Sequence, residues 1–142
     1  MLKGIPTILS PDLLKTLMEM GHGDEIVIAD GNFPAASMAQ RLIRADGHGV
    51  PILLDAIMQL FPLDIFVERP VALMAVAGDE HRPTIWDEYR QIIQRYEVLS
   101  EFELVERFAF YERAQQAYAV IATSEMALYA NIILKKGVIK AS

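Results

Sequence analysis

One stretch of the chain places a histidine where its side chain could do acid–base chemistry. His22 lies between Gly21 and Gly23 and is followed by Asp24. A residue flanked by glycines has no duty in a helix or a strand, and the backbone can bend sharply there. Histidine titrates near neutral pH, which suits a group that accepts and returns protons. The alternative is that the glycines end a helix and that His22 interacts with its negative end.

A carboxylate follows the next apolar run. Asp30 comes directly after residues 26–29 and before Gly31, so we expect its side chain to face a crevice at the end of a strand. An Asx turn or a helix cap is the alternative. Because one strand separates His22 from Asp30, the two lie near opposite ends of that strand in a single subunit. A shared site then requires the loop to fold over the strand, or neighbouring subunits to complete the site.

Further groups that could bind hydroxyl groups occur in the second half of the chain. Arg107 falls in an alternating run over residues 103–108, where an arginine is unusual for a buried strand. Its guanidinium could hold a polar ligand, and a salt bridge to a nearby glutamate is the alternative. Tyr129, Ala130 and Asn131 fall in a predicted polar loop, where a phenol and an amide could bind hydroxyl groups. Asn131 could equally serve as a turn residue.

Helices and strands alternate along most of the chain. Apolar spacing and turn residues predict helices over 11–20, 51–61, 84–97 and 109–116, and strands over 25–30, 41–46, 71–76, 103–108, 118–123 and 132–134. This order predicts one α/β domain over residues 1–142, with a largely parallel central sheet flanked by helices. Ligands of such sheets bind beyond the carboxyl ends of the strands, which directs attention to Asp30, Arg107 and the loop after Thr123.

Composition excludes several classes of function. The chain has 142 residues, with 13 lysines and arginines against 19 acidic residues and a net charge of −6, so we expect no nucleic-acid partner. The absence of cysteine excludes disulfides and thiolate chemistry and favours the cytoplasm. No apolar run is long enough to span a membrane. Neither the ligand spacing of a metal site nor a phosphate-binding glycine loop is present, so we expect no metal and no cofactor.

The hydrophobic fraction is high for a small domain. It reaches 53%, with a mean hydropathy of +0.25. Strands buried on both faces explain part of this excess, and subunit interfaces would hide the rest. We therefore expect a homo-oligomer.

Six motifs give the chain a specific resemblance, which runs from Met1 to about Ile139. They are LKGI over residues 2–5, EMGHGDEIVIAD over 19–30, NFPA over 32–35, IRADG over 43–47, RFAFYERA over 107–114 and YANIILKKG over 129–137. Together they resemble the family of D-ribose pyranases and L-fucose mutarotases, and the NFP, IRADG and RFAFYERA motifs are similar to its fucose branch. Ala130 departs from the pattern, because a glycine is usual there. A methyl group at this position is expected to tighten the pocket or alter which sugar fits.

The resemblance implies a function that the residue types can perform. It implies a mutarotase without cofactors that interconverts the α and β anomers of L-fucose or a related monosaccharide, assembled as a homodecamer with sites at subunit interfaces. It further implies that His22 is the proton donor. By the same resemblance, Asp30, Arg107 and the stretch Tyr129-Ala130-Asn131 bind the sugar. Two alternatives stay open: a D-ribose pyranase that interconverts pyranose and furanose forms, and a sugar-binding oligomer without turnover.

Overall fold

The chain folds around one six-stranded sheet, in a computed structural model that describes residues 1–78 and 81–141. The strands lie in the order β2-β5-β1-β6-β3-β4. Their bounds are β1 (Glu25–Ala29), β2 (Leu42–Ala45), β3 (Val71–Met74), β4 (Glu103–Val105), β5 (Ala119–Thr123) and β6 (Ile132–Lys135). Strand β1 therefore lies near the middle of the sheet, with its residues 26–29 closed to solvent.

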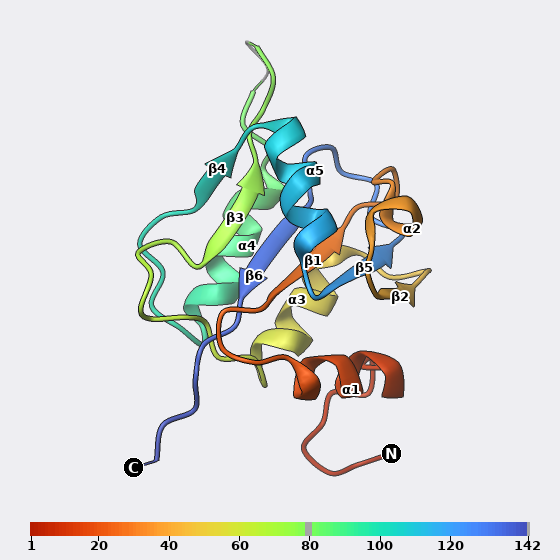
Figure 1. The fold of residues 1–142 in the computed structure, drawn as a ribbon, viewed down its shortest axis with the longest axis vertical. Helices are drawn as coiled ribbons and strands as arrows, with labels where there is room; N and C mark the ends of the chain where they lie inside the picture. The colour runs from red at the N-terminus through yellow and green to blue at the C-terminus, as the bar shows by residue number, and fades with distance from the viewer. Residues whose placement is uncertain (79–80, 142) are drawn as a thin grey trace.

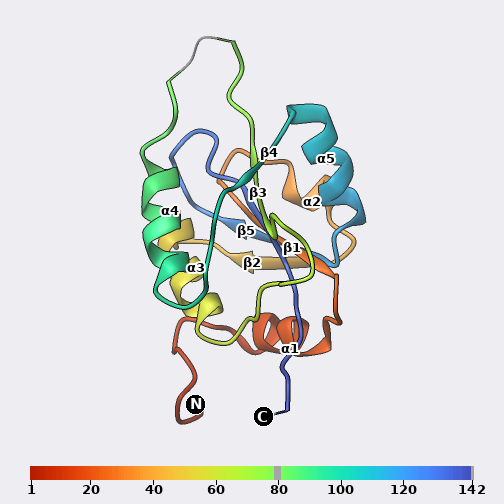
Figure 2. The same cartoon turned by 90° about the vertical axis from the view of Figure 1, so that its left-hand side faces the viewer.

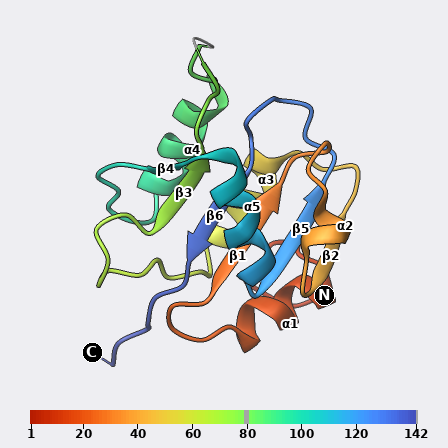
Figure 3. The same ribbon diagram turned by 45° about the horizontal axis from the view of Figure 1, so that its top comes forward.

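Helices cover both faces of the sheet, which gives three layers. Their bounds are α1 (Pro11–Glu19), α2 (Ala35–Met38), α3 (Val50–Met58), α4 (Ile85–Gln94) and α5 (Arg107–Gln116). Helices α3 and α4 lie on one face, and α2 and α5 lie on the other (Figures 1 and 2). Helix α1 closes the end of the sheet near both termini. Turning the top forward shows α5 lying across the middle of its face (Figure 3).

Strand pairing confirms the expectation of a largely parallel sheet. The pairs β1–β5, β2–β5 and β3–β4 are parallel. Strand β6 runs antiparallel to both of its neighbours, β1 and β3. It follows β5 without an intervening helix and returns through the loop 124–131, so it cannot run parallel to β5. This reversal brings the loop before β6 to the end of the sheet where β1 ends.

One predicted element that carries a site residue is wrong. The strand expected over residues 103–108 ends at Val105, and Arg107 is the first residue of α5 rather than part of a strand. The Glu106 carboxylate accepts the backbone N–H groups of Phe108 and Ala109 at 3.0 and 3.1 Å and so caps the helix. This cap satisfies donors that a helix start leaves without partners, and it ends the strand early.

The short helix α2 was not predicted. It begins at Ala35, directly after Pro34, in the stretch between the first two predicted strands. Four residues carry too little periodic signal to separate a helix from a turn. Among the residues that the structure describes, no helix is long and apolar enough to cross a membrane.

Candidate active site

A pocket at the carboxyl end of β1 gathers four of the predicted site residues. Asp30, Arg107, Tyr129 and Asn131 all line one cavity of about 260 Å³. The complete lining, called here the carboxyl-end pocket, is Asp30, Asn32, Phe33, Met74, Arg107, Tyr111, Leu128, Tyr129 and Asn131. Aromatic and apolar side chains line it together with a few polar groups, as is usual for a small-molecule site.

Asp30 and Asn131 form the buried floor of this pocket. Both are almost closed to solvent, at 7% and 4% exposure, and the backbone N–H of Asp30 donates to Oδ1 of Asn131 at 2.7 Å. The Asp30 carboxylate also accepts the N–H of Asn32 at 3.0 Å, so the expected Asx turn is present as well. Burial raises the pKa of Asp30, although backbone N–H groups nearby oppose that rise. A carboxylate at this position can accept hydrogen bonds from the hydroxyl groups of a ligand.

Helix α4 holds the Tyr129-Ala130 segment in place. Tyr129 has a φ of 54°, a backbone conformation that non-glycine residues rarely adopt. The Trp86 ring N–H donates to the carbonyl of Tyr129 at 2.8 Å, and the Tyr89 hydroxyl donates to that of Ala130 at 2.6 Å. Burial raises the pKa of Tyr89, which keeps this hydroxyl protonated as a donor. These two bonds hold the phenol of Tyr129 at the pocket.

The methyl group of Ala130 does not narrow the pocket. Ala130 is fully buried within the apolar core on the α3–α4 side of the sheet, and it is not among the lining residues. The structure therefore gives no support to the expectation that this methyl group tightens the site. The backbone of Ala130 still affects the site, because its N–H lowers the pKa of Asp30 and so opposes the effect of burial.

Arg107 lies at the open side of the pocket. Its Nε donates to the hydroxyl of Tyr111 at 3.1 Å, and its guanidinium lies 5.4 Å from the centre of that ring. The ring of Tyr111 packs edge-on against Phe33, with ring centres 5.6 Å apart. The neighbouring glutamates have other roles: Glu106 caps α5, and Glu103 pairs with Arg113. The remaining donors of the Arg107 fork can therefore reach a ligand.

His22 lies at the opposite end of β1, as its position in the sequence indicated. It belongs to the turn between α1 and β1, at the end of the sheet near the termini (Figure 1). Its Nε2 lies 3.1 Å from Oδ1 of Asp64, and 46% of its side chain is exposed. The sequence left open that His22 interacts with the carboxyl end of α1. Lys136 makes that interaction instead, because its ammonium donates to the carbonyls of Leu17 and Met20. Within one chain, His22 does not line the carboxyl-end pocket.

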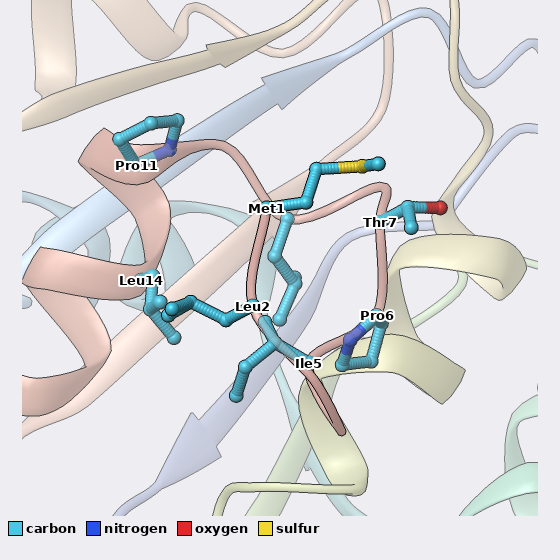
Figure 4. A pocket seen from close by; sticks show the side chains of 8 residues that line it. Met1, Leu2, Ile5, Pro6, Thr7, Pro11 and Leu14 are labelled. Carbon is cyan, nitrogen blue, oxygen red and sulfur yellow. The ribbon is translucent and has the colours of Figure 1, made fainter.

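Two other hollows lack the combination of polar groups that lines the carboxyl-end pocket. An apolar cavity of about 240 Å³ lies between the N-terminal segment and α1, where no charged side chain lines it (Figure 4). A wider hollow beside α2 shares Asp30 with the carboxyl-end pocket, and its other charged residues, Arg44 and Asp46, pair with each other at 2.8 Å. Among the described residues no cluster of side chains could hold a metal ion.

Comparison with known proteins identifies the family. A model of the RbsD / FucU transport protein family matches residues 3–139. The chain belongs to this family. Among curated members of the RbsD / FucU family, the fucose mutarotase of Homo sapiens is 52% identical over 145 residues, which cover 97% of this chain and 94% of that protein.

Solved structures of the RbsD / FucU family agree in fold. The fucose mutarotase of Streptococcus pneumoniae, crystallised in complex with L-fucose, matches with a TM-score of 0.93 and 53% identity over 98% of this chain and all of that one. RbsD of Bacillus subtilis, complexed with D-ribose, matches with a TM-score of 0.76 and 25% identity over 99% of this chain and all of that one. The fucose-bound relative is thus the more similar of these two in both sequence and fold.

Several site residues were not singled out from the sequence. Asn32 is two residues from Asp30 in the chain, whereas Met74 and Leu128 line the pocket because strand pairing and loop packing bring them there. Asp64 follows Pro62 and Leu63 in a segment with no periodic signal, 42 positions from its partner His22. Nothing local in the sequence marks it as the partner of a histidine.

Proposed function

We propose that this protein is a mutarotase that interconverts the α and β anomers of L-fucose by acid–base ring opening and reclosure. The observation that carries the proposal is the full-length likeness to the Streptococcus pneumoniae protein crystallised with L-fucose, with a TM-score of 0.93. The carboxyl-end pocket supports it independently. It combines a buried carboxylate and amide, an arginine fork and aromatic rings around one small cavity.

The reaction requires only proton transfer at two oxygens. A base removes the proton from the anomeric hydroxyl while an acid protonates the ring oxygen, so that the C1–O5 bond breaks and an aldehyde forms at C1. Rotation about C1–C2 and reclosure from the other face then give the other anomer. Positioned acid–base groups contribute about 10²–10⁴-fold, and the reaction needs no redox cofactor or metal.

The roles of the residues in this proposal follow the sequence resemblance, and the lining of the carboxyl-end pocket supports those of the sugar-binding residues. His22 exchanges the proton with the sugar. Asp30, Arg107 and the Tyr129-Ala130-Asn131 stretch bind the hydroxyl groups, while Phe33 and Tyr111 offer aromatic surface to the apolar face of the sugar. The methyl group of a fucose would add to that apolar contact.

The proposal includes a homo-oligomer in which a site draws on two chains. Within one chain, His22 and the carboxyl-end pocket lie at opposite ends of β1, so a neighbouring subunit must bring its histidine to the pocket. Large apolar side chains remain exposed at both ends, such as Phe66 near His22 and Phe108 beside Arg107. A homodecamer, which the sequence resemblance implies, and a location in the cytoplasm, which the absence of cysteine favours, are part of this proposal.

Exchange NMR on the anomeric protons tests the function directly. We expect the protein to accelerate exchange between the anomers of L-fucose more than it accelerates the exchange of D-ribose, and the His22→Ala variant to lose the acceleration. Faster exchange of D-ribose would make the protein a pyranase instead. Sugar binding without accelerated exchange of either sugar would leave a binding protein and refute the proposal.

A further inference from the structure

Asp64 is a buried acid to which the mechanism above gives no role. It is 4% exposed and lies in the segment that joins α3 to β3. Its Oδ1 accepts the backbone N–H of Phe66 at 3.0 Å and lies 3.1 Å from Nε2 of His22. The ring of Phe66 packs against the imidazole at 5.4 Å between centres. His22 is thus held by a carboxylate and by an aromatic ring from the same short segment.

The fold brings this segment and the His22 turn together on the two edges of one strand. On one edge, two backbone hydrogen bonds of 2.8 Å join the His22 turn to Lys136. The N–H of Gly23 donates to the carbonyl of Lys136, and the N–H of Lys136 donates to the carbonyl of Asp24. On the other edge, the N–H of Asp64 donates to the carbonyl of Lys135 at 3.0 Å. Both segments are therefore fixed to the end of β6 by backbone hydrogen bonds.

Gly137 makes the close approach on the second edge possible. Its N–H donates to the carbonyl of Pro62 at 2.7 Å. A β-carbon at position 137 would collide with the carbonyl oxygen of Leu63 and would lie 2.9 Å from Cα of Asp64. Only glycine lets the backbone before Asp64 lie directly against the strand.

The electrostatics of the pair select one form of the imidazole. Burial raises the pKa of Asp64, but the N–H of Phe66, the ring of His22 and the charge of Lys135 outweigh that effect and bring the pKa below its ordinary value. Asp64 is therefore ionised at neutral pH and can only accept hydrogen bonds. In the neutral imidazole the hydrogen must then lie on Nε2, which leaves the lone pair on Nδ1.

We propose that Asp64 is a positioning residue that holds His22 as the Nε2–H tautomer and so makes Nδ1 the atom that exchanges the proton with the sugar. This inference rests on the mutarotase function proposed above. When Nδ1 accepts the proton of the anomeric hydroxyl, Nε2 keeps its own, and the resulting imidazolium lies beside the carboxylate. The positive charge is thus stabilised where it forms, and the proton returns to a sugar oxygen from the same nitrogen.

The Asp64→Asn variant tests the kinetic consequence. An asparagine keeps Oδ1, the oxygen that accepts the N–H of Phe66 and lies beside Nε2 of His22, but it loses the negative charge that stabilises the imidazolium. We expect kcat for anomer exchange to fall about 10- to 100-fold while KM changes less than about twofold. Asp55→Asn is the matched control, because Asp55 is a partly exposed acid that accepts hydrogen bonds from Arg95 and Tyr96 and does not line the carboxyl-end pocket. Equal losses in the two variants would refute the proposal.

The tautomer gives a readout that does not depend on activity. The chain has three histidines, so ring-¹⁵N spectra are simple to assign with His22→Gln. At a pH where the rings are neutral, we expect Nε2 of His22 to carry the hydrogen in the wild type, and the Asp64→Ala variant, which has no acceptor beside Nε2, to shift the balance toward Nδ1–H. A wild-type ring with its hydrogen on Nδ1 would overturn the inference, whether or not the variant folds. A wild type that binds sugar without accelerating exchange would refute the proposed function alone.

Discussion

The two ends of strand β1 are built differently. At its carboxyl end, Asp30 and Asn131 lie buried at the floor of a cavity, and no histidine lines that cavity. At its start, His22 has 46% of its side chain exposed and rests on a buried carboxylate. The first arrangement gathers polar groups around a cavity, and the second leaves an imidazole ring half exposed at the surface.

This contrast fits the division between sugar binding and proton exchange in the proposed function. A pocket that binds hydroxyl groups needs several fixed partners, which the loops at the carboxyl ends of strands supply. A proton-exchanging ring needs access and a fixed tautomer, which the His22–Asp64 pair supplies. Because β1 separates the two within one chain, the proposed function requires a second copy to bring the histidine end to the pocket.

Mixed oligomers give the largest expected effect. We expect chains with His22→Gln and chains with Arg107→Ala to be almost inactive separately, and refolding them together to restore about a quarter of the wild-type exchange rate at low sugar concentration. Exchange NMR on L-fucose measures this. No recovery would show that one chain holds the whole site.

A second mixture serves as the control for subunit exchange. Wild-type chains refolded with equal amounts of the double variant His22→Gln, Arg107→Ala should also retain about a quarter of the rate if sites are shared. If each chain held its own site, about half would remain.

Loss of the arginine fork should weaken binding more than turnover. A hydrogen bond to a charged group contributes about 1.5–3 kcal/mol, so we expect Arg107→Ala to raise KM about tenfold or more, with a smaller change in kcat. Arg69→Ala is the matched control, because Arg69 is an exposed arginine whose partner is Glu101. A loss confined to kcat would instead place Arg107 in proton exchange.

The two buried acids should respond to neutralisation with opposite signs. Because burial raises the folded-state pKa of Asp30, stability is lost as pH rises from the unfolded value of 3.8 through the folded pKa. Asp30→Asn removes this penalty, and we expect its Tm at pH 7 to rise by about 2–5 °C while sugar binding weakens. Thermal unfolding at pH 7 and pH 4 measures the difference, which should shrink at pH 4.

Asp64 provides the opposite case for the same measurement. Its folded pKa is lowered, so its contribution is present above the unfolded value of 3.8 and is lost as pH falls through the folded pKa. Asp64→Asn should therefore lower Tm at pH 7. If both substitutions moved Tm in the same direction, the contrast between the two ends of β1 would not extend to their electrostatics.

The smallest effect is expected at Ala130. Its methyl group is fully buried in the core, so Ala130→Gly should destabilise the fold by about 1 kcal/mol. The ratio of exchange rates for L-fucose and D-ribose should stay the same, because the methyl group does not line the pocket. A changed ratio would show that this position selects the sugar after all.

Local sequence patterns predicted most of the elements and several of the site residues. The apolar run before Asp30 and the glycines around His22 are short-range signals, and both residues lie where those signals placed them, one at each end of β1. The separation of His22 from Asp30 followed from chain order alone, because a strand of five residues is too long for two side chains to meet across. The prediction that Arg107 lies in a strand was wrong. The alternation of polar and apolar residues does not show that the Glu106 carboxylate accepts backbone N–H groups and starts a helix there.

Contacts between distant segments could not be predicted in this way. Asp30 meets Asn131 because β6 runs antiparallel to β1, and His22 meets Asp64 because their segments pair with opposite edges of β6. Amino-acid order and periodicity define which segments form strands and helices and which polar residues end them. The pairing of β6, which depends on backbone hydrogen bonds and buried apolar area summed over the whole chain, determines which of those residues share a site.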